Sequence, residues 1–403
     1  MKLDKLYNNA WQYMKSSGRD TLYLDDNVYT NLLSVVYEKV KDNDLYCDDI
    51  MFGCIDRFLA EDFNHDKLCK NRAEDLLKNI NDTFELNKKT HYLLIPFNGG
   101  VLGKDIYFEN CSFIFGKEDE KIDKIVNITG YDKNELHIFI EHTKKSRSKH
   151  FMEYPMLVFK IENVNSNVYN NSAYFAKLIF MFLKLMVYNA ETKQNIHEFT
   201  SNLYEDNYHV AIIGDEWWQY GHGNWWNLIN FKYSLDFMES KENQKLFGLL
   251  MNAFVFPVDK NEIFFKFLNA LELFEKSLEQ EENYKDTTLS YMLLFAAAES
   301  LLTEGQNEKK LRLSVIWPRL VTISGFSTKE LGLIIRNKYD LRNNFVHAGS
   351  MFDYDEHDDL RTLHQMLAKL IMKYIDDSWV NVKKELEDWK KYVRDTFDDA
   401  IYS

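Results

Sequence analysis

Arg342, Asn343 and His347 lie close together in the segment YDLRNNFVHAG, residues 339–349. A guanidinium group can donate hydrogen bonds to the oxygens of a phosphodiester, and an imidazole can transfer a proton. On an ideal helix Arg342 and His347 are about 140° apart around the axis and about 7.5 Å apart along it, so they do not pair as residues four apart do. The last helical turn favours the imidazolium form of His347, which suits a general acid. Capping of the last helical carbonyls by the same side chains is the alternative interpretation.

The helix that carries these residues has recognisable ends. Ser327 followed by Glu330 predicts a capping box, and Gly349 suits the left-handed position after the last turn. Three apolar residues share one stripe and form the predicted core face: Ile334, Leu341 and Phe345. Three polar residues share a separate stripe: Asp340, Asn343 and His347. Arg342 lies beside the polar stripe, and a contact from Asp340 toward His347 is a further expectation.

A carboxylate and several cations are the expected supporting residues. Glu299 lies in FAAAESLL on an otherwise apolar helix face, where a carboxylate needs a partner, and Arg342 is the candidate. Exposure of Glu299 at the helix end is the alternative. Four cations near the motif are candidates for contact with RNA phosphates: Lys309, Arg312, Arg336 and Lys338. Because the formal net charge is −14, any basic surface has to be local, and solvated helix faces are the alternative for each cation.

The pattern along the chain predicts an α+β fold. Residues 1 to about 85 have apolar positions at helical spacing. Six short β-branched or aromatic runs then predict strands: HYLLIPF, DIYFENCSFIF, ELHIFIEH, PMLVFKIENV, YHVAIIGD and WNLINFKYSLDF. Beyond Pro257, where Asp259 or Asn261 can cap the first helix, we expect five helices and no strand. The predicted domains are a mixed helical and β-sheet region over residues 1–256 and an all-α domain over residues 257–403.

Composition argues against several classes of protein. None of the four cysteines has metal-ligand or disulfide spacing with another: Cys47, Cys54, Cys69 and Cys111. We therefore expect no metal and no other cofactor, and reduced thiols in a cytoplasmic protein. The first residues lack the apolar run of a secretory signal. The most apolar stretch, residues 173–190, contains Lys177 and Lys184 two helical turns apart, which favours a buried helix with one solvent-facing edge over a membrane span.

The segment YDLRNNFVHAG, together with MLLFAAAESLL upstream, resembles the motif pair of HEPN domains, and most closely the Apea-like branch of that family. The resemblance covers roughly residues 257–403. In the family motif an arginine and a polar residue are followed, after a short gap, by a histidine, and Arg342, Asn343 and His347 fit this pattern without insertion. The resemblance implies a helical bundle that dimerises, so that two motifs face each other in one cleft.

The resemblance also implies an activity. Many HEPN proteins are metal-independent endoribonucleases in which the ribose 2′-OH attacks the neighbouring phosphate. In that interpretation His347 transfers a proton, Arg342 stabilises charge on the phosphate and Asn343 positions them. The family context suggests a toxin-like antiviral defence effector that cuts cellular RNA, for example tRNA, after a phage-encoded trigger acts on the N-terminal region. Two alternatives stay open: a non-catalytic module that binds RNA, nucleotide or a protein, and a toxin held inactive by a separate antitoxin.

Overall fold

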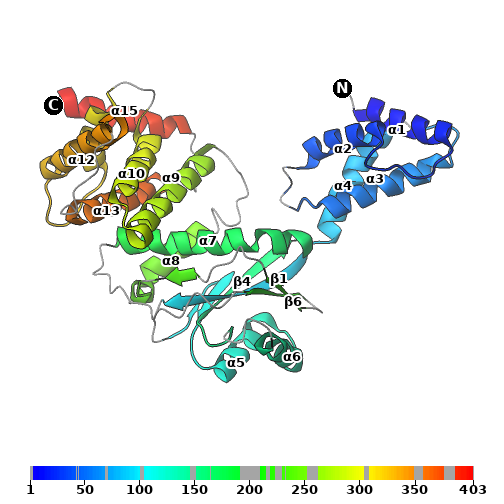
Figure 1. The fold of residues 1–403 in the computed structure, drawn as a ribbon, viewed down its shortest axis with the longest axis horizontal. Coiled ribbons are helices and arrows are strands. Elements are labelled where there is room, and N and C mark those ends of the chain that lie inside the picture. The colour runs from blue at the N-terminus through cyan, green and yellow to red at the C-terminus, as the bar shows by residue number, and fades with distance from the viewer. Residues whose placement is uncertain are drawn as a thin grey trace. The chain divides into compact units, whose positions relative to one another are not determined.

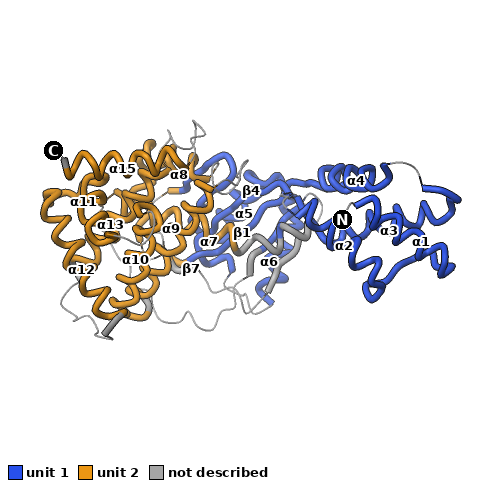
Figure 2. The backbone as a smooth tube through the Cα atoms, turned by 90° about the horizontal axis from the view of Figure 1, so that it is seen from above, with its two compact units in different colours: residues 1–97, 105–173, 202–228 blue, residues 98–104, 174–201, 229–403 orange. Residues whose placement is uncertain are grey.

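The structure is a computed structural model. It describes residues 3–41, 43, 45–68, 71–99, 104–145, 151–163, 165–190, 209–214, 218–222, 229–231, 233–251, 262–303, 308–348, 357–375 and 386–402. The chain divides into two compact units (Figure 2). Unit 1 contains residues 1–97, 105–173 and 202–228, and unit 2 contains residues 98–104, 174–201 and 229–403.

Unit 1 begins with four helices that share one hydrophobic core: α1 (Leu3–Ser17), α2 (Asn27–Val40), α3 (Asp48–Phe63) and α4 (Arg72–Leu86) (Figure 1). Their buried residues repeat at helical spacing, as the sequence predicts. A buried carboxylate, Asp62, connects three of these helices. It accepts a hydrogen bond of 2.7 Å from the Tyr7 hydroxyl and pairs with the Arg72 Nε at 2.8 Å. The predicted helical start of the chain is confirmed.

An antiparallel sheet follows in unit 1, with its strands in the order β2-β3-β4-β1-β5-β6. The strands are β1 (Lys89–Gly99), β2 (Ile106–Tyr107), β3 (Cys111–Ile114), β4 (Met156–Asn163), β5 (His209–Ile213) and β6 (Trp218–His222). The long strands β1 and β4 pair along their length, with Leu93 opposite Phe159. Side chains of α5 (Glu118–Thr129) and α6 (Lys133–Lys144) join sheet residues in one core cluster. Helices and an antiparallel sheet together confirm the α+β class.

The predicted strand over ELHIFIEH is wrong, because these residues belong to helix α6. Asp132 caps the helix and accepts hydrogen bonds from the Asn134 and Glu135 backbone N–H groups at 2.8 and 3.0 Å. The buried residues follow a helical repeat: Leu136, Phe139, Ile140 and Thr143. Ile138, which would share a strand face with Leu136 and Ile140, is instead 56% exposed. The cap and the repeat of three and four residues override the local preference for a strand.

Unit 2 is helical apart from strand β7 (Ile229–Phe231) within its described residues. It holds the second half of α7 (Asn165–Asn189), then η2 (Asp236–Glu239), α8 (Lys241–Leu250), α9 (Glu262–Glu279) and the π-helical turn η4 (Gln280–Tyr284). The later helices are α10 (Thr287–Leu302), α11 (Lys309–Leu320), α12 (Thr328–Ala348), α13 (His357–Tyr374) and α15 (Leu386–Tyr402). From α9 onward the described residues form six α-helices, one more than expected. The short α11 contains Pro318, a residue that usually ends a helix.

Two expectations about unit 2 concern its edges. Residues 252–261 lie outside the described part of the chain, so the boundary at Pro257 and its capping residues stay predictions. On α7, Lys177 is exposed and Lys184 is largely buried, where its ammonium pairs with Glu275 of α9. None of the helices in the described ranges combines the length and the apolarity that a membrane crossing requires.

Candidate functional site

Helix α12 begins with the predicted capping box. The Ser327 N–H donates to the Glu330 Oε2 at 2.7 Å, and the Glu330 N–H donates to the Ser327 Oγ at 3.3 Å. One turn later, Gly332 lies against α11: a Cβ atom added there would be 2.8 Å from the Ser314 carbonyl oxygen. Glycine therefore permits the close packing of α11 on α12. Gly349, the expected C-terminal cap, lies outside the described residues.

The predicted core stripe of α12 is wrong. Its three members, Ile334, Leu341 and Phe345, are only half-buried. The buried residues follow the next stripe around the helix: Leu331, Ile335, Lys338 and Tyr339. The sequence was misleading because this inward face carries a lysine and a tyrosine, while an apolar row lies beside it. Arg342 follows this stripe by helical spacing and is half-buried, with its side chain 23% exposed.

Arg342 is held by three neighbours. Its Nη2 lies 3.7 Å from the Glu299 Oε1 on α10, and its Nη1 donates to the Asn343 Oδ1 at 3.1 Å. Its Cζ lies 5.4 Å from the centre of the Tyr339 ring, within the range of a cation–π contact. The Nε atom is buried and has no hydrogen-bond partner among the described residues. A buried donor without an acceptor is unfavourable. The guanidinium as a whole is partly accessible, since the Arg342 side chain is 23% exposed.

Glu299 is the centre of this cluster. Its side chain is only 11% exposed, which rules out the alternative of a solvent-facing carboxylate. It accepts a hydrogen bond of 2.8 Å from the Tyr339 hydroxyl and pairs with the Lys309 Nζ at 2.7 Å. Burial and the hydrogen bond to Glu299 raise the pKa of Tyr339 to about 12, so the tyrosine remains a donor at neutral pH. The sequence predicts the Arg342 contact but not Tyr339, whose signal is its position three residues before Arg342 on the same helix face.

His347 and Asp340 complete the predicted set. The His347 backbone lies in α12, one turn after Asn343, but its side chain is outside the described part of the structure. The position of its imidazole relative to Arg342 therefore stays a prediction. Asp340 is exposed and forms an ion pair with Lys310 of α11. An Asp340 contact toward His347 also stays a prediction.

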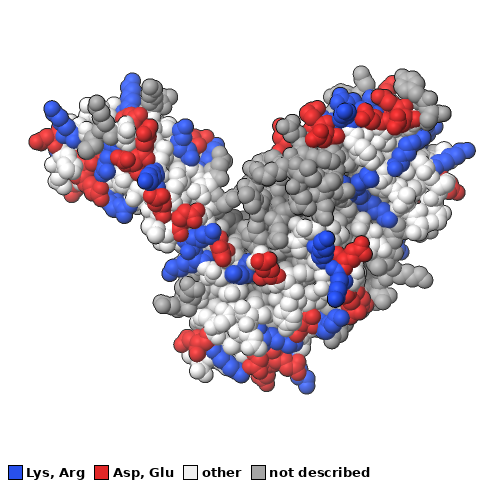
Figure 3. Space-filling view, turned by 180° about the vertical axis from the view of Figure 1, so that it is seen from behind, with Lys and Arg blue, Asp and Glu red and all other residues white. Residues whose placement is uncertain are grey.

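The four predicted RNA-contacting cations lie in different environments. Lys309 is bound to Glu299, and the Arg312 guanidinium stacks 4.8 Å from the centre of the Phe397 ring. Arg336 is exposed. Lys338 is not a surface cation: it is 4% exposed and its Nζ lies 3.0 Å from the Asp359 Oδ2. In the view of Figure 3, basic and acidic side chains alternate over the described surface.

Metal-binding residues and known relatives provide no further guide to this site. Among the described residues no group of three or more His, Cys, Asp or Glu side chains is arranged to hold a metal ion. The described cysteines, Cys47, Cys54 and Cys111, are buried, and Cys69 lies outside the described ranges. Comparisons of the chain with protein-family models, curated proteins and solved structures found no match. The resemblance to HEPN domains therefore rests on the two sequence segments YDLRNNFVHAG and MLLFAAAESLL alone.

Proposed function

We propose that the protein is an endoribonuclease of the HEPN type that cleaves RNA without a metal ion. The observation that supports this most directly is Arg342, which is restrained by Glu299, Asn343 and Tyr339 while its side chain remains 23% exposed. A guanidinium held in this way is preorganised for a phosphate group, because little conformational entropy is lost when the phosphate binds. The His347 backbone follows on the same helix.

In the proposed reaction the ribose 2′-oxygen forms a bond to the adjacent phosphorus atom, and the bond from phosphorus to the 5′-oxygen breaks. A base takes the 2′-OH proton and an acid returns a proton to the leaving 5′-oxygen. His347 fills one of these roles, and Arg342 stabilises the charge on the phosphate oxygens. Asn343 keeps the guanidinium in place through its side-chain oxygen. The products end in a 2′,3′-cyclic phosphate and a 5′-hydroxyl, and DNA is resistant because it lacks the nucleophile.

A second copy of the chain completes the site in this proposal. One histidine serves as base or acid, so a facing motif supplies the other group and the remaining enclosure of the phosphate. Apolar side chains on α12 support such a contact. Leu333 and Val346 are 48% and 46% exposed, and three others are half-buried: Ile334, Leu341 and Phe345. Exposed apolar surface on one helix is typical of a protein interface.

Regulation and cellular role follow from the resemblance. We place the protein in the cytoplasm as a defence effector, with the helices and sheet of the N-terminal region as the part that responds to a phage-encoded trigger. Cellular RNA, with tRNA as one candidate, is the proposed substrate.

A non-catalytic RNA-binding or nucleotide-binding module is the second candidate, and one observation favours it. Arg342 already has a carboxylate neighbour, Glu299, and lies on the inward face of α12, as a purely structural arginine would.

Incubation of the purified full-length protein with total RNA in EDTA, followed by chemical analysis of the RNA ends, separates the two candidates. We expect cleavage that persists in EDTA and leaves 2′,3′-cyclic phosphate ends. Cleavage that stops with the chelator and returns with magnesium would overturn the mechanism. RNA that stays intact with the purified protein, and also in phage-infected cells that express the protein, would favour the non-catalytic module.

A further inference from the structure

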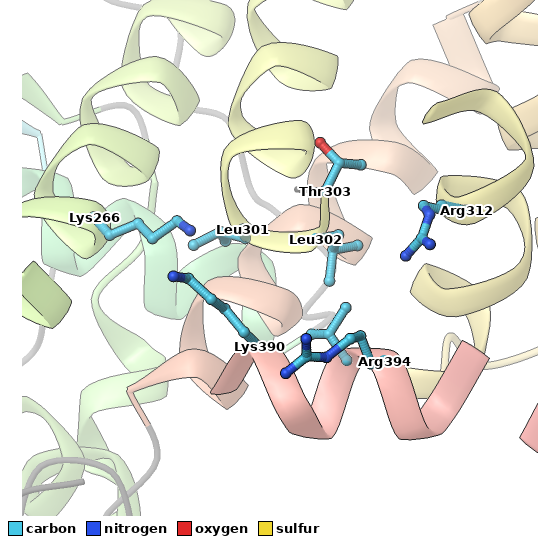
Figure 4. A pocket seen from close by; sticks show the side chains of 8 residues that line it. Lys266, Leu301, Leu302, Thr303, Arg312, Lys390 and Arg394 are labelled. Atoms are coloured by element: carbon cyan, nitrogen blue, oxygen red, sulfur yellow. The ribbon is translucent and has the colours of Figure 1, made fainter. Parts of the chain in front are cut away.

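A basic hollow lies within unit 2, beside the cluster around Glu299. It is shallow and open to solvent, and it is lined by side chains from α9, the end of α10, α11 and α15. Its four cations are Lys266, Arg312, Lys390 and Arg394, and Leu301, Leu302 and Val393 supply apolar walls. Figure 4 shows that Lys266 and Lys390 extend toward each other from α9 and α15. Among the described residues no carboxylate belongs to the lining.

The charge of this hollow is only partly balanced. The Lys390 ammonium pairs with Glu387, one turn earlier on α15. The hydrogen bond from Lys390 and the charges of Arg394 and Lys266 together hold the pKa of the Glu387 carboxyl below its usual value. Neither Arg312 nor Arg394 has an ion pair within the described residues. Two guanidinium groups without an ion pair, facing one space in a chain of net charge −14, favour an anionic ligand.

Capping of helix α10 does not occupy the two arginines of the hollow at two of its last carbonyls. The last turn of α10 ends at Leu302, and the backbone oxygens of Glu299 and Leu301 already have other donors. The Trp389 Nε1 donates to the Leu301 oxygen at 2.7 Å. The Thr303 backbone N–H and hydroxyl donate to the backbone carbonyl oxygen of Glu299 at 3.0 and 2.8 Å. The guanidinium N–H groups of Arg312 and Arg394 are therefore not needed by these carbonyls.

The hollow adjoins the Arg342 site along two helices. On α11, Arg312 lines the hollow and Lys309, three residues earlier, binds Glu299. On α10, Thr303 lines the hollow and Glu299 lies four residues earlier. Residues three and four apart share one face of a helix at a separation of about 5–6 Å between Cβ atoms.

We propose that Lys266, Arg312, Lys390 and Arg394 form a second phosphate subsite, which binds the backbone of the RNA strand next to the phosphate held at Arg342. This proposal rests on the proposed function for the identity of the ligand. Planar guanidinium groups match the oxygens of a phosphate, and the ammonium groups add charge without fixed geometry.

The test compares two double variants with the same loss of charge on the same helices. Arg312→Ala with Arg394→Ala removes two cations of the hollow. The matched control, Arg319→Ala with Lys391→Ala, removes two exposed cations of α11 and α15 that do not line it. The probe is a 2′-O-methyl oligoribonucleotide, which binds but lacks the attacking hydroxyl, and its Kd is measured by fluorescence anisotropy at several salt concentrations.

We expect the hollow variant to raise the Kd about tenfold and to reduce the salt dependence by about one phosphate contact, with a change below about twofold for the control. Arg394→Ala alone is included because Arg394 is exposed, so its loss leaves the fold intact. Equal weakening in both double variants, or no weakening in either, would overturn the subsite. The same holds if the full-length protein binds no RNA, or if Arg394→Ala abolishes binding of inorganic phosphate and leaves RNA binding unchanged.

Failure of the proposed function is distinguishable from failure of this subsite. Binding of the uncleavable RNA that depends on the hollow, in a protein that cuts no RNA, supports the subsite and contradicts the nuclease. Conversely, RNA cleavage together with RNA binding that is unaffected by loss of the hollow's cations supports the nuclease and contradicts the subsite.

Discussion

Glu299 and Arg342 face each other across helices α10 and α12 with 3.7 Å between the Oε1 and the Nη2, a longer distance than either of the other contacts of Glu299. The carboxylate is bound more closely by Tyr339 at 2.8 Å and by Lys309 at 2.7 Å. Its attraction for Arg342 is therefore shared with two other donors. An arginine oriented in this way can turn to a phosphate oxygen at small cost, because Glu299 keeps partners after the exchange.

The helical phase of α12 can be tested with two adjacent isoleucines. Ile335 is fully buried and Ile334 is half-buried. Ile335→Ala should lower the free energy of unfolding by about 2–5 kcal/mol, as large-to-small changes in a core do, and Ile334→Ala by less than about half of that. Urea denaturation of the two variants measures the difference. Equal losses would contradict the inward face defined by Leu331, Ile335 and Tyr339.

Gly332 provides a test of the packing between α11 and α12. An alanine there would place its Cβ 2.8 Å from a backbone oxygen of Ser314, which has little room to move. Gly332→Ala should therefore destabilise the protein by about 1–3 kcal/mol, although alanine is the better helix former by about 1 kcal/mol. Gly248→Ala in α8 is the matched control, since nothing lies within 4 Å of its Cβ position and it should be neutral or stabilising. A stabilising Gly332→Ala would show that the two helices are further apart.

His364 gives a prediction for pH. It is fully buried on α13, its Nε2 lies 2.8 Å from the Ser277 Oγ, and burial lowers its pKa to about 3. The unfolded chain binds a proton at a pKa of about 6.5, so this residue costs stability as the pH falls below that value. Glu281, whose Oε2 is 3.4 Å from the His364 Nδ1, acts in the opposite direction, because burial and the Glu282 charge raise its pKa to about 7. The folded state then holds a proton that the unfolded state releases between about pH 4.5 and 7.

The contributions of His364 and Glu281 to the pH dependence of stability can be separated by His364→Gln. This change removes the titration of the imidazole and leaves the Glu281 carboxyl in place. The variant should be less stable than the natural protein at pH 7, and this deficit should shrink by about 2 kcal/mol between about pH 6.5 and pH 5. Chemical denaturation at three pH values measures it. A deficit that stays constant with pH would mean that His364 binds a proton equally well in the folded protein and in the unfolded chain.

The parts of the structure that the sequence predicts are those set by local signals. The helical start, the strands around Leu93 and Phe159 and the capping box at Ser327 all follow from residues close together in the chain. The apolar residues of α6 fit the alternating repeat of a strand as well as the repeat of a helix. Only the capping residue Asp132 distinguishes the two in the sequence. The inward face of α12 does not follow from the apolar pattern, because an ion pair and a hydrogen bond allow Lys338 and Tyr339 to be buried there. The basic hollow has no sequence signal, since Lys266 and Arg394 come from helices that only the fold brings together.

Cleavage by variants of the motif is the most direct measurement of the central claim. Because Arg342 lies on the inward face, Arg342→Ala is expected to lower stability as well as activity, so His347→Ala and Arg342→Lys are the informative changes. Asn344→Ala, at an exposed position between them, is the matched control. With total RNA in EDTA, we predict that His347→Ala and Arg342→Lys reduce formation of cyclic-phosphate ends at least about 100-fold, as loss of a general acid or base does, while Asn344→Ala keeps full activity. Full cleavage by a normally folded His347→Ala protein would contradict the account and return the motif to a capping role.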